Sequence, residues 1–266
     1  MRIGFFDSGI GGVSVLAEAL EQYPDQEYLY DADVDHVPYG EKTADEIAHY
    51  ATENARFLLS AGAQALVVAC NTATAVAIGA IREMTDIPVI GMEPAVKPAV
   101  EGLPGENGNR MRVLVAATPV TLREAKLKDL IHRVDPGHLV DLLPLPQLVP
   151  LAEKCRFDTA EARTYLQEAF SGIDPAAYSA FVIGCTHFQY FKPLFRELLG
   201  EEVRLVDGNA GTVRRLGSVL GLDPAGAEKP ETYRVSWFRS GRPVEDAGEI
   251  DYYRTFLDRA AQVRDL

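Results

Sequence analysis

The chain has 266 residues, of which 47% are hydrophobic and 24% charged, so it is a globular protein with enough length for one large α/β domain or two of about 130 residues. Its 26 Lys and Arg residues against 39 Asp and Glu residues give a formal net charge of −13, which argues against non-specific binding to nucleic acid or to an anionic membrane. No stretch reaches the roughly 20 apolar residues of a membrane span, and the three cysteines are too few and too far apart for a disulfide framework, so we expect a cytoplasmic protein with free thiols.

In the first part of the chain, short apolar runs alternate with segments of helical period. Thr43, followed three residues later by Glu46, is typical of a capping box at the start of a helix. The alternation of strands and helices predicts βαβ units and a mainly parallel sheet. We expect strands at 2–6, 27–33, 65–70 and 88–92, and helices at 13–23, 43–60, 73–84 and from Pro94 onward.

The alternation restarts after LPGENGNR (103–110), the strongest linker signal in the chain. An alternating run at 232–238 is typical of an exposed antiparallel strand, and a helix at 252–263 closes the chain. We therefore predict an α/β fold with two pseudo-symmetric domains, each a mainly parallel sheet flanked by helices, and a functional site in the cleft between them. The other expected strands are 112–117, 138–144, 180–185 and 203–208, and the other helices are 119–132, 147–154, 158–171, 191–199 and about 210–220.

Two strand ends carry the same pattern, LVVACNTAT (66–74) and FVIGCTHFQ (181–189), in which an apolar strand leads through Cys to polar residues that open a helix. Ligands bind beyond the carboxyl ends of parallel strands, so Cys70 and Cys185 would each stand at the functional edge of a sheet, beside a helix N-terminus that favours a thiolate. Taken alone, either cysteine is better explained by ordinary burial at a strand end. The repeated pattern favours a site, whereas Cys155 lacks this context and is interpreted as incidental.

The first strand ends in DSGIGG (7–12), a glycine-rich loop that allows close backbone approach to a ligand. A dinucleotide site is a weak interpretation, because the third glycine of that motif is missing and Asp7 would crowd a pyrophosphate. A carboxylic acid substrate fits the loop better, which leaves Asp7 as a hydrogen-bond partner or proton acceptor. The alternative for Asp7 and Ser8 is a plain helix N-cap.

Two further segments carry polar residues that could reach the same cleft. Pro38 and Gly40 shape the turn DVDHVPYG (33–40), so Tyr39 points into the cleft unless the segment is only a turn. Cys185-x-His187 suggests metal ligation or thiol activation, but a zinc site needs about four ligands and the few histidines and cysteines are scattered. We expect His187 to contact substrate rather than to pair with Cys185, since side chains two residues apart usually diverge; a structural histidine is the alternative.

A pair of thiols on opposite sides of a bound acid suits proton exchange at a stereocentre. Racemisation takes a proton from one face of a carbon and returns one to the other face, so it needs an acid–base group on each side. An unperturbed thiol pKa of about 8.5 is near enough to neutral pH for modest tuning to yield a thiolate. Asp7 and His187 are the candidate tuners, one on each side. No lysine lies in a recognisable pyridoxal context, so we expect no cofactor.

Six motifs in order over almost the whole chain carry a family resemblance: DSGIGG (7–12), VPYG (37–40), ACNTA (69–73), PVIGMEPAVKPA (88–99), LVPLAE (148–153) and GCTH (184–187). Together they resemble the glutamate racemases of the cofactor-independent aspartate/glutamate racemase superfamily. The sequence departs from the family pattern at Phe188-Gln189, where Tyr-Pro is usual, at Thr74, where Ser is common, and at VDGNAG (206–211), which replaces a more usual Asp-Ser.

The resemblance implies an isomerase that interconverts L- and D-glutamate without cofactor or metal and supplies D-glutamate for peptidoglycan, and so for the cell wall and cell shape. It implies that Cys70 serves the D-enantiomer and Cys185 the L-enantiomer, with Asp7 and His187 assisting them. By the same motif match, the substrate-binding residues are Ser8, Tyr39, Gly40, Asn71, Thr72 and Thr186, and Asp33 and Glu153 are further acidic site residues.

The resemblance also implies an arrangement of domains and partners. Residues 1–98 and 208–266 form the first domain, to which the C-terminal segment returns, and residues 99–207 form the second. The expected partner is glutamate, not nucleic acid or a membrane, and the expected assembly is a cytoplasmic homodimer. Three alternatives stay open: a racemase of another acidic amino acid such as aspartate, a non-catalytic ligand-binding relative, and a nucleotide-dependent oxidoreductase that uses the loop at 7–12.

Overall fold

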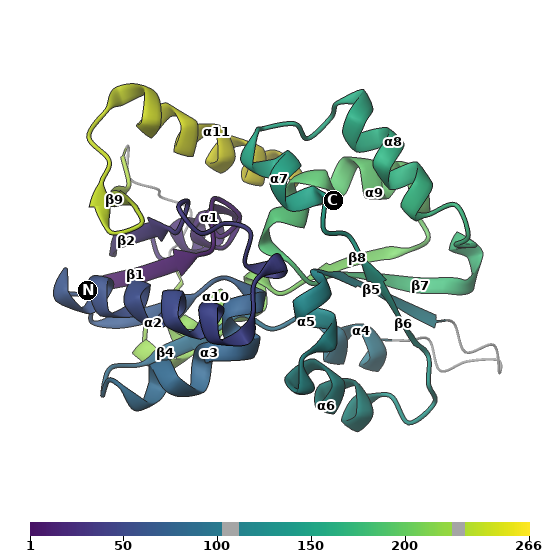
Figure 1. Cartoon of the computed structure of the whole chain (residues 1–266), viewed down its shortest axis with the longest axis horizontal. Coiled ribbons are helices and arrows are strands. Elements are labelled where there is room, and N and C mark those ends of the chain that lie inside the picture. Colours follow the sequence, from purple (N-terminus) through teal and green to yellow (C-terminus); the bar gives the residue numbers. More distant parts are fainter. Residues whose placement is uncertain (103–111, 225–231) are drawn as a thin grey trace.

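The chain forms two α/β domains, each built on a parallel sheet between layers of helices (Figure 1). The computed structural model describes residues 1–102, 112–224 and 232–266, so the linker predicted at 103–110 lies outside the described residues. Within those ranges, no helix combines the length and the apolar character that crossing a membrane requires.

The first sheet has six strands in the order β10-β9-β2-β1-β3-β4. Strands β1 to β4 come from the start of the chain, and the last two strands return from its end to extend the sheet beyond β2. The bounds are β1 Arg2–Asp7, β2 Glu27–Ala32, β3 Ala65–Val68, β4 Val89–Gly91, β9 Arg234–Arg239 and β10 Arg242–Pro243.

The second sheet has four parallel strands in the order β6-β5-β7-β8, which repeats the order β2-β1-β3-β4 of the first. The predicted pseudo-symmetry is thereby confirmed, and β3 and β7 hold equivalent positions. Because parallel strands all end at one edge, equivalent strands deliver their following residues to equivalent sites. The bounds are β5 Arg112–Ala117, β6 Val140–Pro144, β7 Tyr178–Ile183 and β8 Arg204–Asp207.

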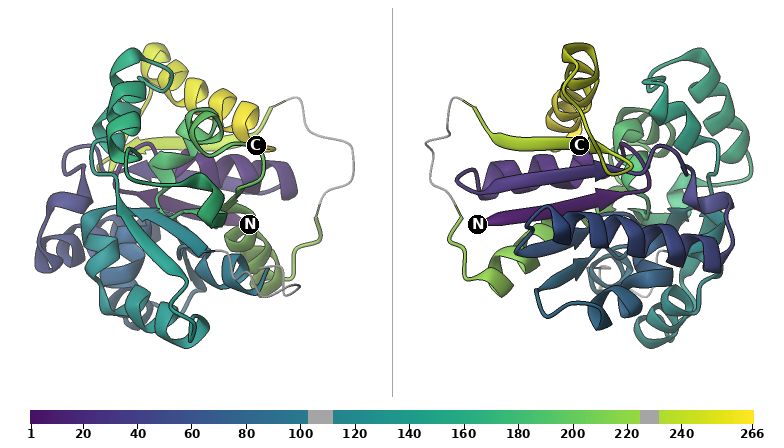
Figure 2. Two further views of the ribbon diagram at one scale, coloured as in Figure 1. Left: turned by 90° about the vertical axis from the view of Figure 1, so that its right-hand side faces the viewer. Right: turned by 60° about the vertical axis from the view of Figure 1, so that its left-hand side comes forward.

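Helices cover both faces of the first sheet, and successive residues of β1 face opposite layers. Phe5 packs toward one layer of helices and Phe6 toward the other. In both views of Figure 2, α11 lies on the opposite side of this sheet from α2 and α3. One layer contains α1 (Val13–Gln22), α10 (Asn209–Leu220) and α11 (Ala247–Val263), and the other contains α2 (Ala44–Ser60) and α3 (Asn71–Glu83).

The second sheet is enclosed in the same way, and one of its faces shares a core with the first domain. Phe181 belongs to the same cluster of buried side chains as Phe5, and Tyr190 and Phe256 lie in this cluster too. The two domains therefore share one continuous apolar core. The helices on one face are α4 (Val96–Glu101), α5 (Pro119–Arg123) and α6 (Ala125–Val134). Those on the other face are α7 (Leu148–Glu153), α8 (Ala160–Ala169) and α9 (Lys192–Leu199). Three 3₁₀ helices lie in connections of the chain: η1 (Tyr39–Glu41), η2 (Pro175–Ala177) and η3 (Thr186–Phe191).

Three local expectations differ from the structure. The run at 232–238 was expected as an antiparallel strand, but β9 pairs in parallel with β2 and is antiparallel only to the short β10. The helix expected at 119–132 is broken at Glu124, whose backbone is extended, and continues as α6. The final helix begins five residues earlier than expected, where Asp246 caps it by accepting the N–H of Glu249.

Candidate active site

Cys70 stands at the carboxyl end of β3 and caps the N-terminus of α3. Its sulfur accepts the backbone N–H of Ala73 at 3.4 Å and lies 3.6 Å from Ser8 Oγ. The side chain is almost fully buried. Burial raises the pKa of this thiol to about 12, and the nearby Asp7 and Cys185 side chains add to the shift while Ala73 and Ser8 oppose it. In the resting protein Cys70 therefore holds its proton.

Cys185 holds the equivalent position after β7, and its sulfur lies 4.0 Å from His187 Nδ1. The expectation that these two side chains diverge is therefore wrong. The chain enters the 3₁₀ helix η3 directly after Cys185, and in this turn the imidazole lies within contact distance of the thiol. Both side chains are nearly inaccessible to solvent.

His187 is held between acidic groups of both domains. Its Nε2 lies 2.7 Å from Glu153 Oε1, and its Nδ1 lies 4.0 Å from Asp7 Oδ1. Burial alone would lower the pKa of His187, but the contacts with Cys185 and Glu153 and the charge of Asp7 raise it well above its usual value. The ring is therefore an imidazolium at neutral pH that can donate a hydrogen bond toward the sulfur of Cys185.

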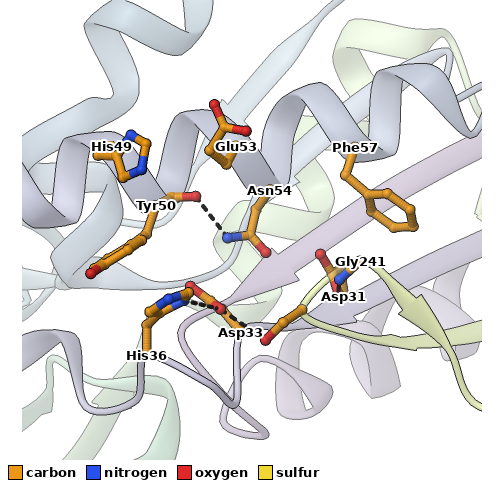
Figure 3. A pocket seen from close by; sticks show the side chains of 10 residues that line it. Asp31, Asp33, His36, His49, Tyr50, Glu53, Asn54, Phe57 and Gly241 are labelled. Carbon is orange, nitrogen blue, oxygen red and sulfur yellow. Dashed lines mark hydrogen bonds and ion pairs between the residues drawn. The ribbon is translucent and has the colours of Figure 1, made fainter.

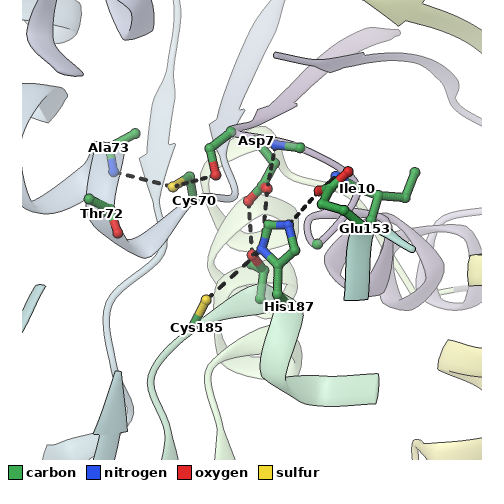
Figure 4. A network of polar contacts seen from close by, with 12 residues as sticks. Asp7, Ile10, Cys70, Thr72, Ala73, Glu153, Cys185 and His187 are labelled. Atoms are coloured by element: carbon green, nitrogen blue, oxygen red, sulfur yellow. Dashed lines mark hydrogen bonds and ion pairs between the residues drawn. The ribbon is translucent and has the colours of Figure 1, made fainter. Parts of the chain in front are cut away.

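Asp7, at the end of β1, links the two domains through its carboxylate. Its Oδ2 accepts the hydroxyl of Thr186 at 2.9 Å, and its Oδ1 accepts the N–H of Gly9 at 3.0 Å. Burial raises its pKa, while His187 and Thr186 oppose the shift. Figure 4 shows the resulting network, in which Cys70 contacts the residue next to Asp7 and Thr186 leads to His187 and Cys185. Both thiols thus belong to one buried polar region formed by both domains.

The glycine-rich loop makes room for side chains of the second domain. A Cβ added at Gly9 would overlap Glu153 Oε1, and one added at Gly11 would overlap His187 Nδ1 and Thr186 Oγ1. These glycines are required by close packing between the domains rather than by an unusual backbone conformation. The N–H of Ile10 donates to Glu153 Oε1 at 2.8 Å, so the carboxylate that this loop binds in the structure is one of the protein's own.

Two tyrosines that the sequence analysis did not single out fix this loop from opposite sides. The hydroxyl of Tyr30 donates to the carbonyl of Gly9 at 2.9 Å, and that of Tyr190 lies 3.2 Å from the carbonyls of both Ile10 and Gly11. Both rings are fully buried. No local signal could have found them, because a tyrosine in an apolar run reads as core.

Tyr39 and Asp33 form a second polar cluster next to the first. The hydroxyl of Tyr39 donates to Asp33 Oδ2 at 2.5 Å, and Asp33 Oδ1 accepts from His36 and Ser240. The backbone N–H of Asp33 donates to the carbonyl of Asp7. Burial and the Asp33 carboxylate raise the pKa of Tyr39, and Cys70 and Asp7 are close enough to contribute. Asp33 thus orients Tyr39 and does not contact either thiol.

The two residues after Cys70 have different surroundings: the amide of Asn71 is unpartnered among the described residues, and Thr72 contacts the second domain. Both polar atoms of the Asn71 side chain are buried and have no hydrogen-bond partner within the described parts of the chain. Thr72 Oγ1 lies 3.0 Å from the hydroxyls of both Thr118 and Thr121 in the second domain, two residues that the sequence analysis missed. Gly40 packs against Thr118, where a Cβ would be too close.

The structure therefore brings most of the predicted site residues together. No group of three His, Cys, Asp or Glu side chains in the described ranges is placed to hold a metal ion. The third cysteine, Cys155, is exposed and lies outside the network. The central network contains Asp7, Ser8, Cys70, Glu153, Cys185, Thr186 and His187; Asp33, Tyr39, Gly40, Asn71 and Thr72 surround it.

Comparison with curated proteins identifies relatives along the full length of the chain. It is 46% identical over 267 residues to a glutamate racemase of Campylobacter curvus, with all of both chains covered. It is 41% identical to glutamate racemase 2 of Bacillus subtilis, covering 97% of this chain and 96% of that protein.

Solved structures agree with the sequence comparison. A glutamate racemase of Campylobacter jejuni matches with a TM-score of 0.80 at 26% identity, over 97% of this chain and 98% of that one. The Escherichia coli glutamate racemase, solved in complex with L-glutamate and the activator UDP-MurNAc-Ala, matches with a TM-score of 0.78 at 28% identity, over 97% and 94% of the two chains. The family model of the Asp/Glu/hydantoin racemases matches residues 13–216. The chain belongs to the Asp/Glu/hydantoin racemase family.

Proposed function

We propose that this protein interconverts L- and D-glutamate by deprotonation and reprotonation at the α-carbon, with Cys70 and Cys185 as the two acid–base groups. The observation that carries the proposal is the placement of the two thiols at equivalent strand ends of the two domains, in one buried polar network. Membership of a racemase family favours this chemistry over a nucleotide-dependent oxidoreductase and over a non-catalytic binding protein.

In the proposed reaction from L-glutamate, Cys185 is the base and Cys70 is the acid. Cys185, acting as a thiolate, takes the α-proton, and the electron pair of the C–H bond stays on the α-carbon. The Cys70 thiol, which burial keeps protonated, then donates its proton to the opposite face. This leaves Cys185 as the thiol and Cys70 as the thiolate, and the reverse reaction from D-glutamate runs the same steps backwards.

The surrounding residues divide into those that bind substrate and those that position the acid–base groups. Asn71 carries the strongest sign of a missing ligand, because its buried amide offers a donor and an acceptor without partners in the described structure. An α-amino acid supplies both complements, a carboxylate and an ammonium group. The hydroxyl of Ser8 lies beside the sulfur of Cys70, and that of Thr186 lies between Asp7 and His187. Both complete the carboxylate-binding set in this proposal, with Tyr39, Gly40 and Thr72 at its border.

Glu153 and Asp33 act as positioning residues in this proposal. Glu153 holds the ring of His187, and Asp33 holds the hydroxyl of Tyr39. Since both sulfurs are nearly inaccessible, substrate entry requires the two domains to separate across the Asp7–Thr186 and Thr72–Thr118 contacts.

We further propose the cellular role that the family resemblance implies. The product D-glutamate would serve peptidoglycan synthesis in the cytoplasm, and the protein would act as a homodimer. Size-exclusion chromatography with light scattering tests the assembly, and a mass of one chain would contradict the dimer.

Three Cys→Ser variants test the mechanism. Cys70→Ser and Cys185→Ser should each lower racemisation of L- and D-glutamate, followed by circular dichroism, by about 10²–10⁴-fold, because each removes one of the two acid–base groups. Cys155→Ser is the matched control and should keep full activity, since that thiol is exposed and outside the network. Retained turnover in both of the first two variants would refute the two-thiol mechanism.

Isotope and substrate experiments separate the remaining possibilities. In D₂O without added cofactor, the wild-type protein should place solvent deuterium at the α-carbon of the product. Dependence on added pyridoxal phosphate would contradict the proposal.

Parallel kinetics on L-glutamate and L-aspartate test the substrate, and a higher kcat/KM for aspartate would identify a racemase of the other acidic amino acid.

A further inference from the structure

A polar cavity lies beside the carboxyl end of β2, away from both cysteines. Its volume is about 300 Å³, and it opens between the end of β2, one face of α2 and the turn that joins β9 to β10 (Figure 3). Three carboxylates, two imidazoles and two aromatic rings line it. The residues that matter for the argument are Asp31, Asp33, Tyr50, Glu53, Asn54 and Phe57.

Two buried acceptor atoms line this cavity without a partner. Asp31 is fully buried, and its Oδ1 accepts the N–H of Gly241 at 3.0 Å, but its Oδ2 has no hydrogen-bond partner among the described residues. Asn54 is 6% exposed, and within the same residues its Oδ1 has no partner either. In Figure 3 the Asn54 oxygen points away from α2 and toward the side of the cavity where Asp31 lies.

The orientation of the Asn54 amide is fixed by its other end. Its Nδ2 donates to the carbonyl of Tyr50 at 2.7 Å and lies 3.4 Å from the hydroxyl of Tyr39. Exchanging the oxygen and nitrogen would place an acceptor against the Tyr50 carbonyl, so the oxygen is the atom that faces the cavity. A buried acceptor left without a donor is costly, so a donor is expected there.

The two acceptors cannot satisfy each other at neutral pH. Burial raises the pKa of Asp31 to about 6, with the charge of Asp33 adding to the shift and the Gly241 amide and Arg242 opposing it. Above that pH Asp31 is a carboxylate, and a carboxylate and an amide oxygen both need donors. The nearby Asp33 already accepts from His36, Tyr39 and Ser240. The two acceptors therefore call for two donor hydrogens, and the charge of the Asp31 carboxylate favours a donor group that is positively charged.

The lining favours an organic cation over a metal ion. No three carboxylate, imidazole or thiol groups in the described structure are placed to hold a metal, as noted above. The volume greatly exceeds that of a bare ion, and Phe57 and Tyr50 provide an apolar wall. The Tyr50 ring is stacked on His36 and has the ammonium group of Lys42 at 5.6 Å from its centre, so it already accommodates one organic cation. Glu53, on the exposed side of α2 at the border of the cavity, is paired with Arg56, so the charge within the cavity comes from Asp31 and Asp33.

We propose that this cavity is a binding site for a small organic ammonium ion, whose –NH₃⁺ group donates to Asp31 Oδ2 and Asn54 Oδ1 while its carbon chain lies against Tyr50 and Phe57. The site is separate from the cysteines. The cavity lies next to Tyr39, because Asn54 and Asp33, which line the cavity, both contact the hydroxyl of that residue.

Calorimetric titration with 1,4-diaminobutane at pH 8 tests the proposal. One molecule should bind per chain, and 1,4-butanediol, which has the same length without charge, should not bind. Potassium chloride and magnesium chloride are titrated in parallel. No heat from the diamine, equal binding of the diol, or binding of the inorganic cations alone would overturn the proposal.

Substitutions locate the binding to this cavity. Asp31→Asn keeps an acceptor for Gly241 and removes the charge of the buried carboxylate, so it should fold with an unchanged or raised Tm and weaken diamine binding by at least about tenfold. Asp35→Asn is the matched control, because it removes the same charge from a more exposed carboxylate next to the cavity that pairs with Arg242. Its effect should stay below about threefold.

A second variant keeps the test decisive if the first does not fold. Asn54→Leu removes the other acceptor with little change in volume and should also weaken diamine binding by at least about tenfold. Unchanged affinity in both variants, or an equal loss in Asp35→Asn, would show that the diamine binds elsewhere or by net charge alone.

Discussion

His187 is the residue at which charge from both domains meets, and its protonation should set the upper pH limit of activity. Its pKa is raised by contacts with Cys185 and Glu153 and by the charge of Asp7, against the effect of burial. Glu153→Gln keeps an acceptor for Ile10 and for the ring but removes a negative charge. The pKa of His187 should fall, so the alkaline limb of kcat/KM should move down by about one pH unit.

The sign of the stability effect follows from the same shift. Because folding raises the pKa of His187, the contribution of its proton to stability is complete below the unfolded value of about 6.5 and is lost as pH rises through the folded value. Urea unfolding should therefore show Glu153→Gln losing stability at neutral pH. Glu161→Gln, which removes an exposed charge on α8 that pairs with Arg156, is the control. A pH profile of Glu153→Gln that matched the control would contradict this role for Glu153.

At the scale of single residues, the sequence predicts which side chains carry the reaction better than it predicts which side chains contact one another. Cys70 and Cys185 were recognisable because the same pattern follows two apolar strands, and the topology makes those strand ends equivalent. The contact of His187 with Glu153 joins residues 34 positions apart and depends on glycines whose missing side chains make room for it. Spacing along the sequence could not reveal this contact, and the two-residue spacing alone led to the wrong expectation for the Cys185–His187 pair.

At the scale of elements, the N-terminus of α5 joins the two domains. Thr118 caps this helix by accepting the N–H of Thr121, and its hydroxyl also lies 3.0 Å from Thr72 Oγ1 in the first domain. Thr118→Ala removes both the cap and the contact. It should cost about 1 kcal/mol of stability, measured by urea unfolding, and should raise the KM for glutamate because Thr72 loses its support.

A cap elsewhere supplies the control for that prediction. Thr159 caps α8 by accepting the N–H of Ala162 and lies away from the site. Thr159→Ala should lose a similar amount of stability, about 1 kcal/mol, with the KM unchanged. If both variants raised the KM equally, the effect would belong to general loosening of the protein and not to the contact between the domains.

Elements whose signals are local were predicted, and those that depend on distant partners were not. The capping box of Thr43 and Glu46 is confirmed, since both of its hydrogen bonds are made within four residues. The predicted antiparallel direction of β9 was wrong. Alternation of polar and apolar residues indicates that a strand has two different faces, but it does not indicate which neighbour the strand pairs with. Its pairing with β2 joins positions more than 200 residues apart.

At the scale of the whole molecule, the shared core predicts that the two domains unfold as one unit. Phe256 on α11 packs with its ring 5.5 Å from that of Phe157 and 5.1 Å from that of Tyr190, and both of these belong to the part of the chain around the second sheet. The apolar core runs without interruption from one sheet to the other. The division of the chain at residues 98/99 and 207/208 remains a prediction about topology, and it need not mark units that unfold separately.

Calorimetry of Phe256→Ala tests this shared core. The wild-type protein should unfold in one transition, and the variant should also unfold in one, with stability lower by about 3–5 kcal/mol and a Tm lower by about 10 °C. Val219→Ala on the exposed side of α10 should change stability by less than about 0.5 kcal/mol. Trp237, the single tryptophan, lies in β9 and reports the first domain. Its fluorescence should change at the same temperature as the circular dichroism of the whole chain, because a first domain that melted apart from the second would separate the two curves.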